Sequence, residues 1–165
     1  GRVGLSTCFD IGWRGDWQAL EDAGVQIVVW NSAYHGGKLL NAYAAVHMFY
    51  IVTSVWNAPS RIIDPFGNDI AESSGWDAFA SAEVDARAEI FHFDHHEDML
   101  PKLRAEYGDR VSFRVEPLGN MFELSVDDPL TLDEVKEKFG LVNYHDYHKR
   151  STDDNAKLLS EYPES

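Results

Sequence analysis

The fold of this chain is organised around residues 3–10, which read Val3-Gly4-Leu5-Ser6-Thr7-Cys8-Phe9-Asp10. Side chains alternate between two faces over residues 2–8, and a period of two predicts a β-strand. Cys8 is the only cysteine among 165 residues, and it stands where this strand is expected to end in a turn. Nucleophiles are often held at such strand ends, because the sheet fixes the backbone while the side chain is exposed. The stretch therefore predicts a strand that ends on a candidate nucleophile.

Two further apolar runs follow this strand at the spacing of a βαβαβ unit. Residues 25–30 and 49–55 are rich in β-branched and aromatic side chains, which is typical of strands covered on both faces. Helical spacing of apolar residues predicts helices over 16–23 and 39–46. A strand–helix–strand–helix–strand order with short connections predicts a parallel sheet with right-handed crossovers.

The pattern becomes antiparallel after Trp56. Residues 61–64 and 69–72 are predicted to pair as a hairpin around the Pro/Gly turn at 65–68. Residues 79–84 are predicted to add a further strand. The chain as a whole is therefore expected to be α/β.

Beyond Ala86 the sequence predicts a mixture of shorter elements. In order, these are an extended or helical segment at 90–93, a helix from Pro101 to Gly108, strands at 110–115 and 121–126, a helix at 132–139 after Thr131, and a frayed helix with a loose end over 145–165.

Composition excludes several classes of protein. The formal charge of −14 repels phosphate backbones, so no nucleic-acid partner is expected. No apolar run approaches the ~20 residues that span a bilayer, and no leader segment is recognised, so no membrane partner is expected either. One cysteine cannot form an internal disulfide, which makes a cytoplasmic location the default. The chain begins at Gly1 and enters a strand within two residues, so we expect a piece of a longer protein.

Five pieces of the sequence together resemble the carbon–nitrogen hydrolase (nitrilase) superfamily. Cys8-Phe9-Asp10-x-x-Trp13 is similar to the family's nucleophile motif: cysteine, aromatic, acid, two variable residues, aromatic. The other pieces follow in the family's order at residues 23–32, 42–54, 60–67 and 83–85. The resemblance implies that residues 1–90 are the C-terminal part of the family domain and that residues 91–165 are a C-terminal extension.

The resemblance also implies a fold and an activity. The fold would be the C-terminal part of a four-layer α-β-β-α sandwich. The activity would be hydrolysis of a non-peptide carbon–nitrogen bond, in a small amide, carbamoyl or nitrile substrate, through a cysteine thioester and without a cofactor. In the family a Glu base, a Lys and a second Glu precede the cysteine, whereas only seven residues precede Cys8 and none is Lys or Glu. We therefore expect the parent protein to be an amidase-like homo-oligomer and this chain alone to be inactive.

Site roles follow from the same resemblance and from strand position. Cys8 is the predicted nucleophile, and the backbone N–H of Phe9 is the predicted donor to the oxyanion. The predicted loop at 31–37 follows a buried parallel strand at the edge where α/β sheets bind ligands. The first four residues of this loop are therefore candidate pocket walls: Asn31, Ser32, Ala33 and Tyr34. Trp13, the aromatic residue of the nucleophile motif, is a further candidate. A plain loop and a core role for Trp13 are the competing interpretations.

Two alternatives stand beside the hydrolase. One is a non-catalytic relative in which Cys8 is a small apolar residue or serves oligomer or partner contacts. The other is a metal-dependent protein using His92, Asp94, His95 and His96. That segment is also explained as a helix start, with Asp94 and Glu97 forming a capping box, and no metal is expected there.

Overall fold

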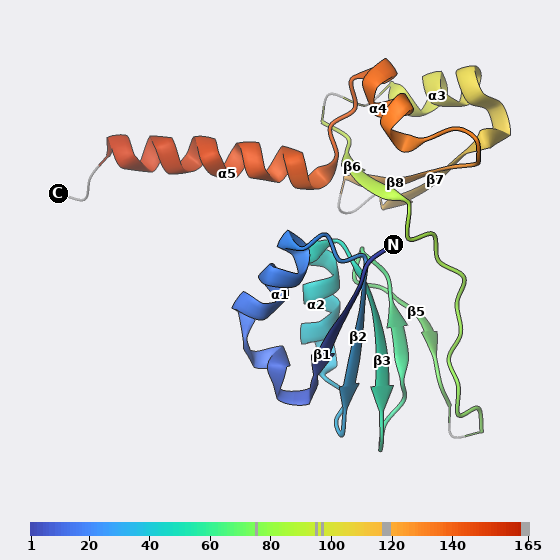
Figure 1. Ribbon diagram of the computed structural model, residues 1–165, viewed down its shortest axis with the longest axis vertical. Helices are drawn as coiled ribbons and strands as arrows, with labels where there is room; N and C mark the ends of the chain where they lie inside the picture. Colours follow the sequence, from blue (N-terminus) through green and yellow to red (C-terminus); the bar gives the residue numbers. More distant parts are fainter. Residues whose placement is uncertain (75, 95, 97, 117–119, 163–165) are drawn as a thin grey trace. The chain divides into compact units, whose positions relative to one another are not determined.

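The computed structural model describes residues 1–74, 76–94, 96, 98–116 and 120–162. The chain divides into two compact units, Gly1–Ala86 and Arg87–Ser165. Each unit contains one β-sheet and its own buried apolar core. Two sheets and five α-helices in the described residues make a mixed α/β fold, as predicted (Figure 1).

The first unit is built on a five-stranded sheet in the order β1-β2-β3-β4-β5. Its elements are β1 (Val3–Thr7), the 3-10 helix η1 (Cys8–Gly12), α1 (Arg14–Asp22), β2 (Ile27–Ser32), α2 (Gly37–His47), β3 (Tyr50–Val55), β4 (Arg61–Ile63) and β5 (Asp69–Glu72). Strands β1, β2 and β3 pair in parallel, whereas β4 and β5 are antiparallel. The predicted βαβαβ unit and hairpin are therefore confirmed.

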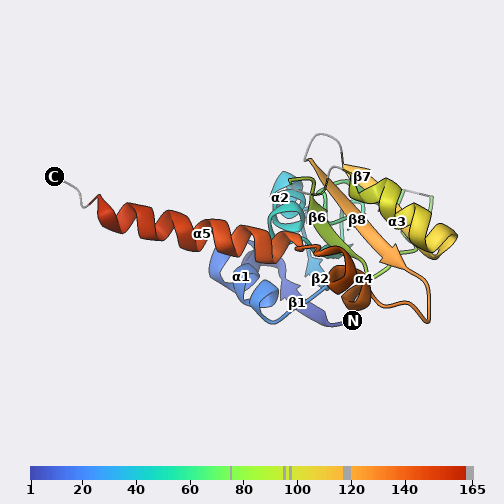
Figure 2. The same ribbon diagram turned by 90° about the horizontal axis from the view of Figure 1, so that it is seen from above.

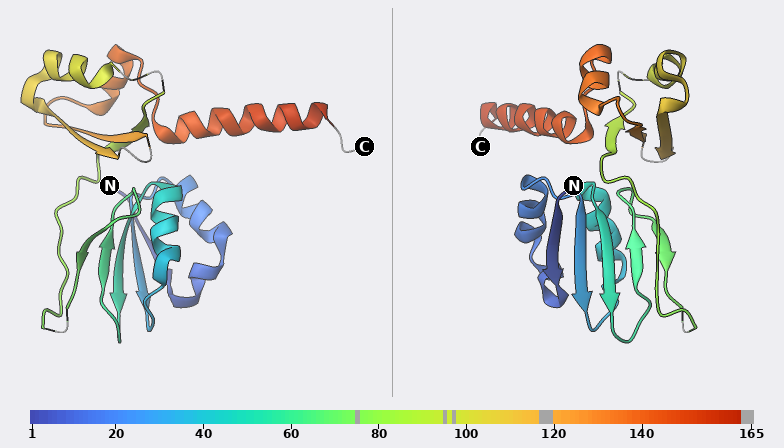
Figure 3. Two further views of the ribbon diagram at one scale, coloured as in Figure 1. Left: turned by 180° about the vertical axis from the view of Figure 1, so that it is seen from behind. Right: turned by 45° about the vertical axis from the view of Figure 1, so that its right-hand side comes forward.

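Both helices of this unit cover the same face of the sheet (Figure 3). The core beneath them contains Trp17 from α1, Leu40 from α2 and Trp30 from β2, all fully buried. Trp17 stacks on Tyr43 of α2 with ring centroids 4.5 Å apart, which ties the two helices together. This packing buries the apolar stripe that the helical spacing predicted.

The opposite face of the sheet is apolar but open at β1. Val3 and Leu5 are 62% and 74% exposed, while Gly4 and Ser6 between them are buried against the helices. The register places Ile27 beside Val3 in the neighbouring strand, and Ile27 is only partly buried. An exposed row of large apolar side chains on a sheet is unusual in a protein that is not in contact with a partner.

The second unit has a three-stranded antiparallel sheet in the order β6-β8-β7. Its elements are β6 (Glu89–His92), α3 (Met99–Tyr107), the 3-10 helix η2 (Gly108–Arg110), β7 (Val111–Glu116), β8 (Met121–Val126), α4 (Leu132–Phe139) and α5 (Tyr144–Glu161). Leu103 of α3 and Val135 of α4 are fully buried against Phe122 of β8. Helix α5 runs out from this unit and has no buried residue (Figure 2).

Several predicted boundaries are wrong. Residues 79–84 form no strand, because the segment is mostly small residues and Phe79, its largest apolar side chain, is 84% exposed. Helix α3 begins at Met99, so Pro101 lies in its first turn, where a missing N–H costs no hydrogen bond. Residues 145–161 belong to one continuous helix and are not frayed.

The remaining differences concern loops and uncertain positions. Asn31 and Ser32 were expected in a loop, but β2 continues through Ser32 because both pair with β3. Glu97 of the predicted capping box lies outside the described residues. No helix in the described part of the chain combines the length and apolar character needed to cross a bilayer.

Candidate functional site

Cys8 occupies a strained turn at the carboxyl end of β1. Its φ angle is 47°, in the left-handed region, and its side chain is half-buried. A left-handed backbone costs a non-glycine residue roughly 1–2 kcal/mol, and such strain persists only where surrounding contacts hold it. The strained residue is the same one that the sequence predicts to be the nucleophile.

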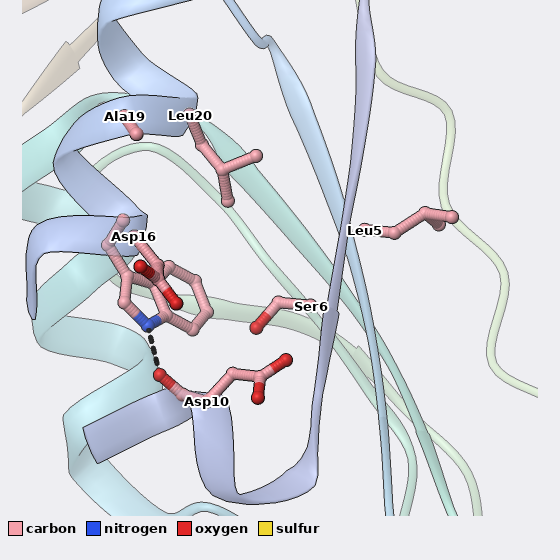
Figure 4. Close-up of a pocket in the computed structure, with 7 residues that line it drawn as sticks. Leu5, Ser6, Asp10, Asp16, Ala19 and Leu20 are labelled. Atoms are coloured by element: carbon pink, nitrogen blue, oxygen red, sulfur yellow. Dashed lines mark hydrogen bonds between the residues drawn. The ribbon is translucent and has the colours of Figure 1, made fainter. Parts of the chain in front are cut away.

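Side-chain hydrogen bonds from the core hold the backbone of η1. The indole Nε1 of Trp17 donates to the Asp10 carbonyl at 3.1 Å, the dashed contact in Figure 4. The hydroxyl of Tyr43 donates to the Ile11 carbonyl at 2.9 Å. The Asp10 carboxylate in turn accepts the backbone N–H of Thr7 at 2.8 Å, which closes the turn on its strand side. The buried side chains of Trp17 and Tyr43 thus fix the turn that carries Cys8.

A second tyrosine hydroxyl, that of Tyr34, reaches the backbone of Cys8 itself. The hydroxyl of Tyr34 lies 3.4 Å from the Cys8 carbonyl, and its ring packs edge-to-face on Trp30 at 5.5 Å. Burial raises the pKa of the Tyr34 phenol above its ordinary value, and the negative charge that Cys8 can carry raises that pKa further. Tyr34, a predicted pocket residue, is therefore an electrostatic neighbour of the thiol.

Other predicted pocket residues lie at the same edge of the sheet. Phe9 and Trp13 are 72% and 55% exposed, and their rings pack edge-to-face at 6.4 Å. Asn31 is the register partner of Thr7, the residue before Cys8. The parallel register thus puts the ends of β1 and β2 at one edge of the sheet, and a pocket role for these residues stays a prediction.

Ser32 and Ala33 complete the segment after β2. The Ser32 hydroxyl accepts the backbone N–H of Tyr34 at 3.0 Å, which shapes the turn that presents the phenol. Ala33 is exposed and contributes its backbone to the same turn. That Ser32 and Ala33 line a substrate pocket stays a prediction.

Trp56 is a site-edge residue that the sequence analysis did not select. It directly follows β3, is 83% exposed, and donates its backbone N–H to the Ser32 carbonyl at 3.1 Å. The rule that selected residues 31–34 applies equally to the end of β3, so that rule would have identified Trp56.

The next feature of the site is the surroundings of the Cys8 thiol. In the described part of the chain, no Lys, His, Asp or Glu side chain hydrogen-bonds to Cys8. A thiol must become a thiolate to attack an amide or nitrile carbon, and this needs an adjacent base or cation. Within the described residues, the geometry therefore fixes the position of the Cys8 thiol but gives it no acidic or basic side-chain partner.

The histidine-rich segment is occupied by packing contacts. His92 stacks on Tyr147 of α5 with centroids 5.0 Å apart, and Asp94 accepts the Tyr147 hydroxyl at 2.7 Å. His96 hydrogen-bonds through Nδ1 to the His92 carbonyl at 2.9 Å. His95 lies outside the described residues, and the described residues contain no group of three acidic, His or Cys side chains placed to hold a metal.

Comparison with known proteins gives matches among solved structures. No protein-family model matches the chain, and no curated protein matches it. Nit3 from Saccharomyces cerevisiae, a member of branch 10 of the nitrilase superfamily, is 16% identical over 64% of this chain and 41% of its own, with a TM-score of 0.47. A carbon–nitrogen hydrolase from Helicobacter pylori is 15% identical over 66% of this chain and 48% of its own, with a TM-score of 0.48.

An amidase from Nesterenkonia sp. is also similar, at 18% identity over 65% of this chain and 44% of its own, with a TM-score of 0.44. The chain spans less than half the length of each of these three structures. The matched structures belong to the superfamily that the sequence motifs resemble.

Proposed function

We propose that this chain carries the nucleophile of a carbon–nitrogen hydrolase acting on amide, carbamoyl or nitrile substrates. The observation that supports this most is the left-handed Cys8 at the end of a parallel strand, half-buried and held by aromatic hydrogen bonds. A cysteine kept only as a small apolar residue gains nothing from a strained backbone.

The proposed reaction proceeds through a thioester. For an amide or carbamoyl substrate, a base removes the Cys8 proton, and the sulfur attacks the carbonyl carbon to give a tetrahedral intermediate. The Phe9 N–H, in the first turn of η1, would hydrogen-bond to the negative oxygen; losing one such donor typically costs ~3–4 kcal/mol of barrier. The base returns its proton to the leaving amine, and water then releases the acid. The base and the cationic partner would come from residues upstream of this chain.

The open face of the first sheet supports a larger assembly. We propose that a second sheet packs on Val3 and Leu5, which would complete a four-layer α-β-β-α sandwich with residues 1–90 as its C-terminal part. Burying one such side chain fully is worth roughly 1.5–3 kcal/mol. In this proposal residues 91–165 are an extension of that domain. A homo-oligomeric state and a cytoplasmic location stay predictions.

The alternative is a non-catalytic module of the same fold. It is favoured by the thiol's lack of an acidic or basic partner within the described residues. The two proposals differ in whether a Glu and a Lys in family-like context are encoded ahead of Gly1.

The test compares this chain with the product of its whole reading frame. Ammonia release from short aliphatic amides is measured for the chain, for the whole product, and for the whole product carrying Cys8→Ser. The hydrolase proposal requires turnover only by the unmutated whole product, with a thioester mass on Cys8 after rapid acid quench. Turnover by the isolated chain would contradict the need for upstream groups, and an inactive whole product would favour the module.

A further inference from the structure

A recess opens on the flank of β1, on the side where that strand has no neighbouring strand. It has a volume of about 310 Å³ and lies between β1 and the first two turns of α1. Its lining includes Leu5, Ser6, Asp10, Asp16, Trp17 and Leu20, several of which Figure 4 shows facing one another. A single water needs only ~10–15 Å³ of such space, so the recess can hold a molecule of several atoms.

The recess contains a buried polar group that has no partner. Ser6 is only 7% exposed, and its hydroxyl oxygen has no hydrogen bond to any described residue. Buried hydroxyls are almost always hydrogen-bonded, and an unpaired one is a cost that a bound molecule can remove. Figure 4 shows this hydroxyl on the α1 side of β1, directed toward Asp10.

Two carboxylates in the recess have acceptor capacity that the described residues leave unused. One oxygen of Asp10 accepts the Thr7 N–H, and no described residue donates to the other. The exposed carboxylate of Asp16, in the first turn of α1, accepts no hydrogen bond from the described residues. No basic side chain lines the recess. Three side chains with oxygen acceptors therefore line one space, and among the described lining residues the Ser6 hydroxyl is the one side-chain donor that is not already used.

Apolar groups form the rest of the wall. Leu20 and the buried Trp17 ring contribute hydrocarbon and aromatic surface, whereas the Leu5 side chain points to the opposite side of β1 in Figure 4. This lining matches a molecule with several N–H donors and a positive charge at one end and a short apolar body at the other.

We propose that this recess binds a small organic cation with N–H donors, an alkylammonium or guanidinium group. Its N–H groups would donate to the Ser6 hydroxyl and to the carboxylates of Asp10 and Asp16, while its alkyl part packs on Leu20. The site does not depend on the Cys8 chemistry. It is separate from the thiol but joined to it through Asp10, which also caps the turn that carries Cys8.

The test uses n-butylammonium chloride on the intact 165-residue chain, followed by amide chemical shifts in NMR. Tetramethylammonium chloride is the control cation, because it has the same charge and no N–H. Saturable shifts are expected at Ser6, Asp16 and Leu20 with butylammonium and not with tetramethylammonium.

Three variants locate the contacts. Ser6→Ala and Asp16→Asn should each weaken butylammonium binding, at least about tenfold for Ser6→Ala, the scale of a hydrogen bond to a charged group. Asp22→Asn removes an equal charge from the same helix outside the recess and should change affinity less than twofold. Without ligand, Ser6→Ala should melt at an equal or higher temperature than the unmutated chain, because it removes an unpaired buried hydroxyl.

Four results would overturn the proposal. They are equal shifts with both cations, unchanged affinity in Ser6→Ala, displacement of butylammonium by Mg²⁺ at equal concentration, and self-association that buries the β1 edge and abolishes the shifts. None of them bears on amide hydrolysis, so this proposal and the proposed function can fail separately.

Discussion

Replacing Cys8 by glycine and by alanine measures the strain at the proposed nucleophile. Both changes remove the thiol, so any contribution of the sulfur cancels in the comparison. Alanine keeps the left-handed penalty at φ 47°, roughly 1–2 kcal/mol, whereas glycine escapes it. Glycine instead loses about 0.5–1 kcal/mol more conformational entropy on folding. We expect Cys8→Gly to be more stable than Cys8→Ala by about 0.5–1 kcal/mol.

Ala23 offers a matched control in the same unit. Its φ is −78°, an ordinary right-handed value, so Ala23→Gly should destabilise the chain by about 0.5–1 kcal/mol. The alanine-to-glycine change should thus have opposite signs at the two positions. The entropy terms cancel between them, which leaves the left-handed penalty as the difference.

Urea unfolding followed by tryptophan fluorescence reads this unit selectively. All five tryptophans lie within residues 1–86, and Trp17 and Trp30 are fully buried. For a unit of this size, 1 kcal/mol also moves the melting temperature by roughly 4–8 °C. The alanine-to-glycine change can instead destabilise the chain equally at positions 8 and 23. That result would mean that the turn at Cys8 is unstrained. The main support for the nucleophile assignment would then be lost.

Three further predictions concern stability. Trp17→Ala should cost about 3–5 kcal/mol in urea unfolding, because the ring is fully buried and leaves a cavity; a loss below 1 kcal/mol would contradict the packing of α1. Arg61→Met should cost about 3 kcal/mol, since Arg61 is 2% exposed and pairs with Asp69 at 2.9 Å, and Asp69→Asn in that background should recover part of the loss. Hydrogen bonds from the Thr131 hydroxyl and backbone N–H lower the pKa of Glu134 below its ordinary value. The ionised Glu134 therefore stabilises the fold above about pH 4.5, and this stabilisation is lost as the pH falls through the lowered pKa. Circular dichroism melts of Glu134→Gln should show a smaller loss of stability on acidification than the unmutated chain, and parallel pH profiles would refute the capping role.

The local sequence predicted most elements of the first unit. Alternation over residues 2–8 and the apolar runs that became β2 and β3 each depend on a periodicity that neighbouring residues determine. Thr131 predicted the start of α4 for the same reason, because a capping box closes within four residues. The error at residues 79–84 has the opposite cause: a strand needs a partner, and the segment's own side chains do not specify one.

The local sequence predicted only part of the candidate site. Cys8 and residues 31–34 could be selected because parallel strands end at a common edge, a property of the topology. The left-handed turn at Cys8 could not, since it depends on hydroxyl and indole donors from α1, α2 and the segment after β2. The Ser6 recess was missed for the same reason, because a polar group has no partner only in relation to everything packed around it.

The sequence by itself determined the type and order of most elements in the first unit, and which residue could act as a nucleophile. Those properties follow from side-chain periodicity and chemical type over a few neighbouring positions. Only the tertiary structure decided that Cys8 is strained, that Val3 and Leu5 remain uncovered, and that three oxygen acceptors share one recess. Burial and hydrogen bonding are sums over residues distant in the chain, and only folding brings those residues into contact.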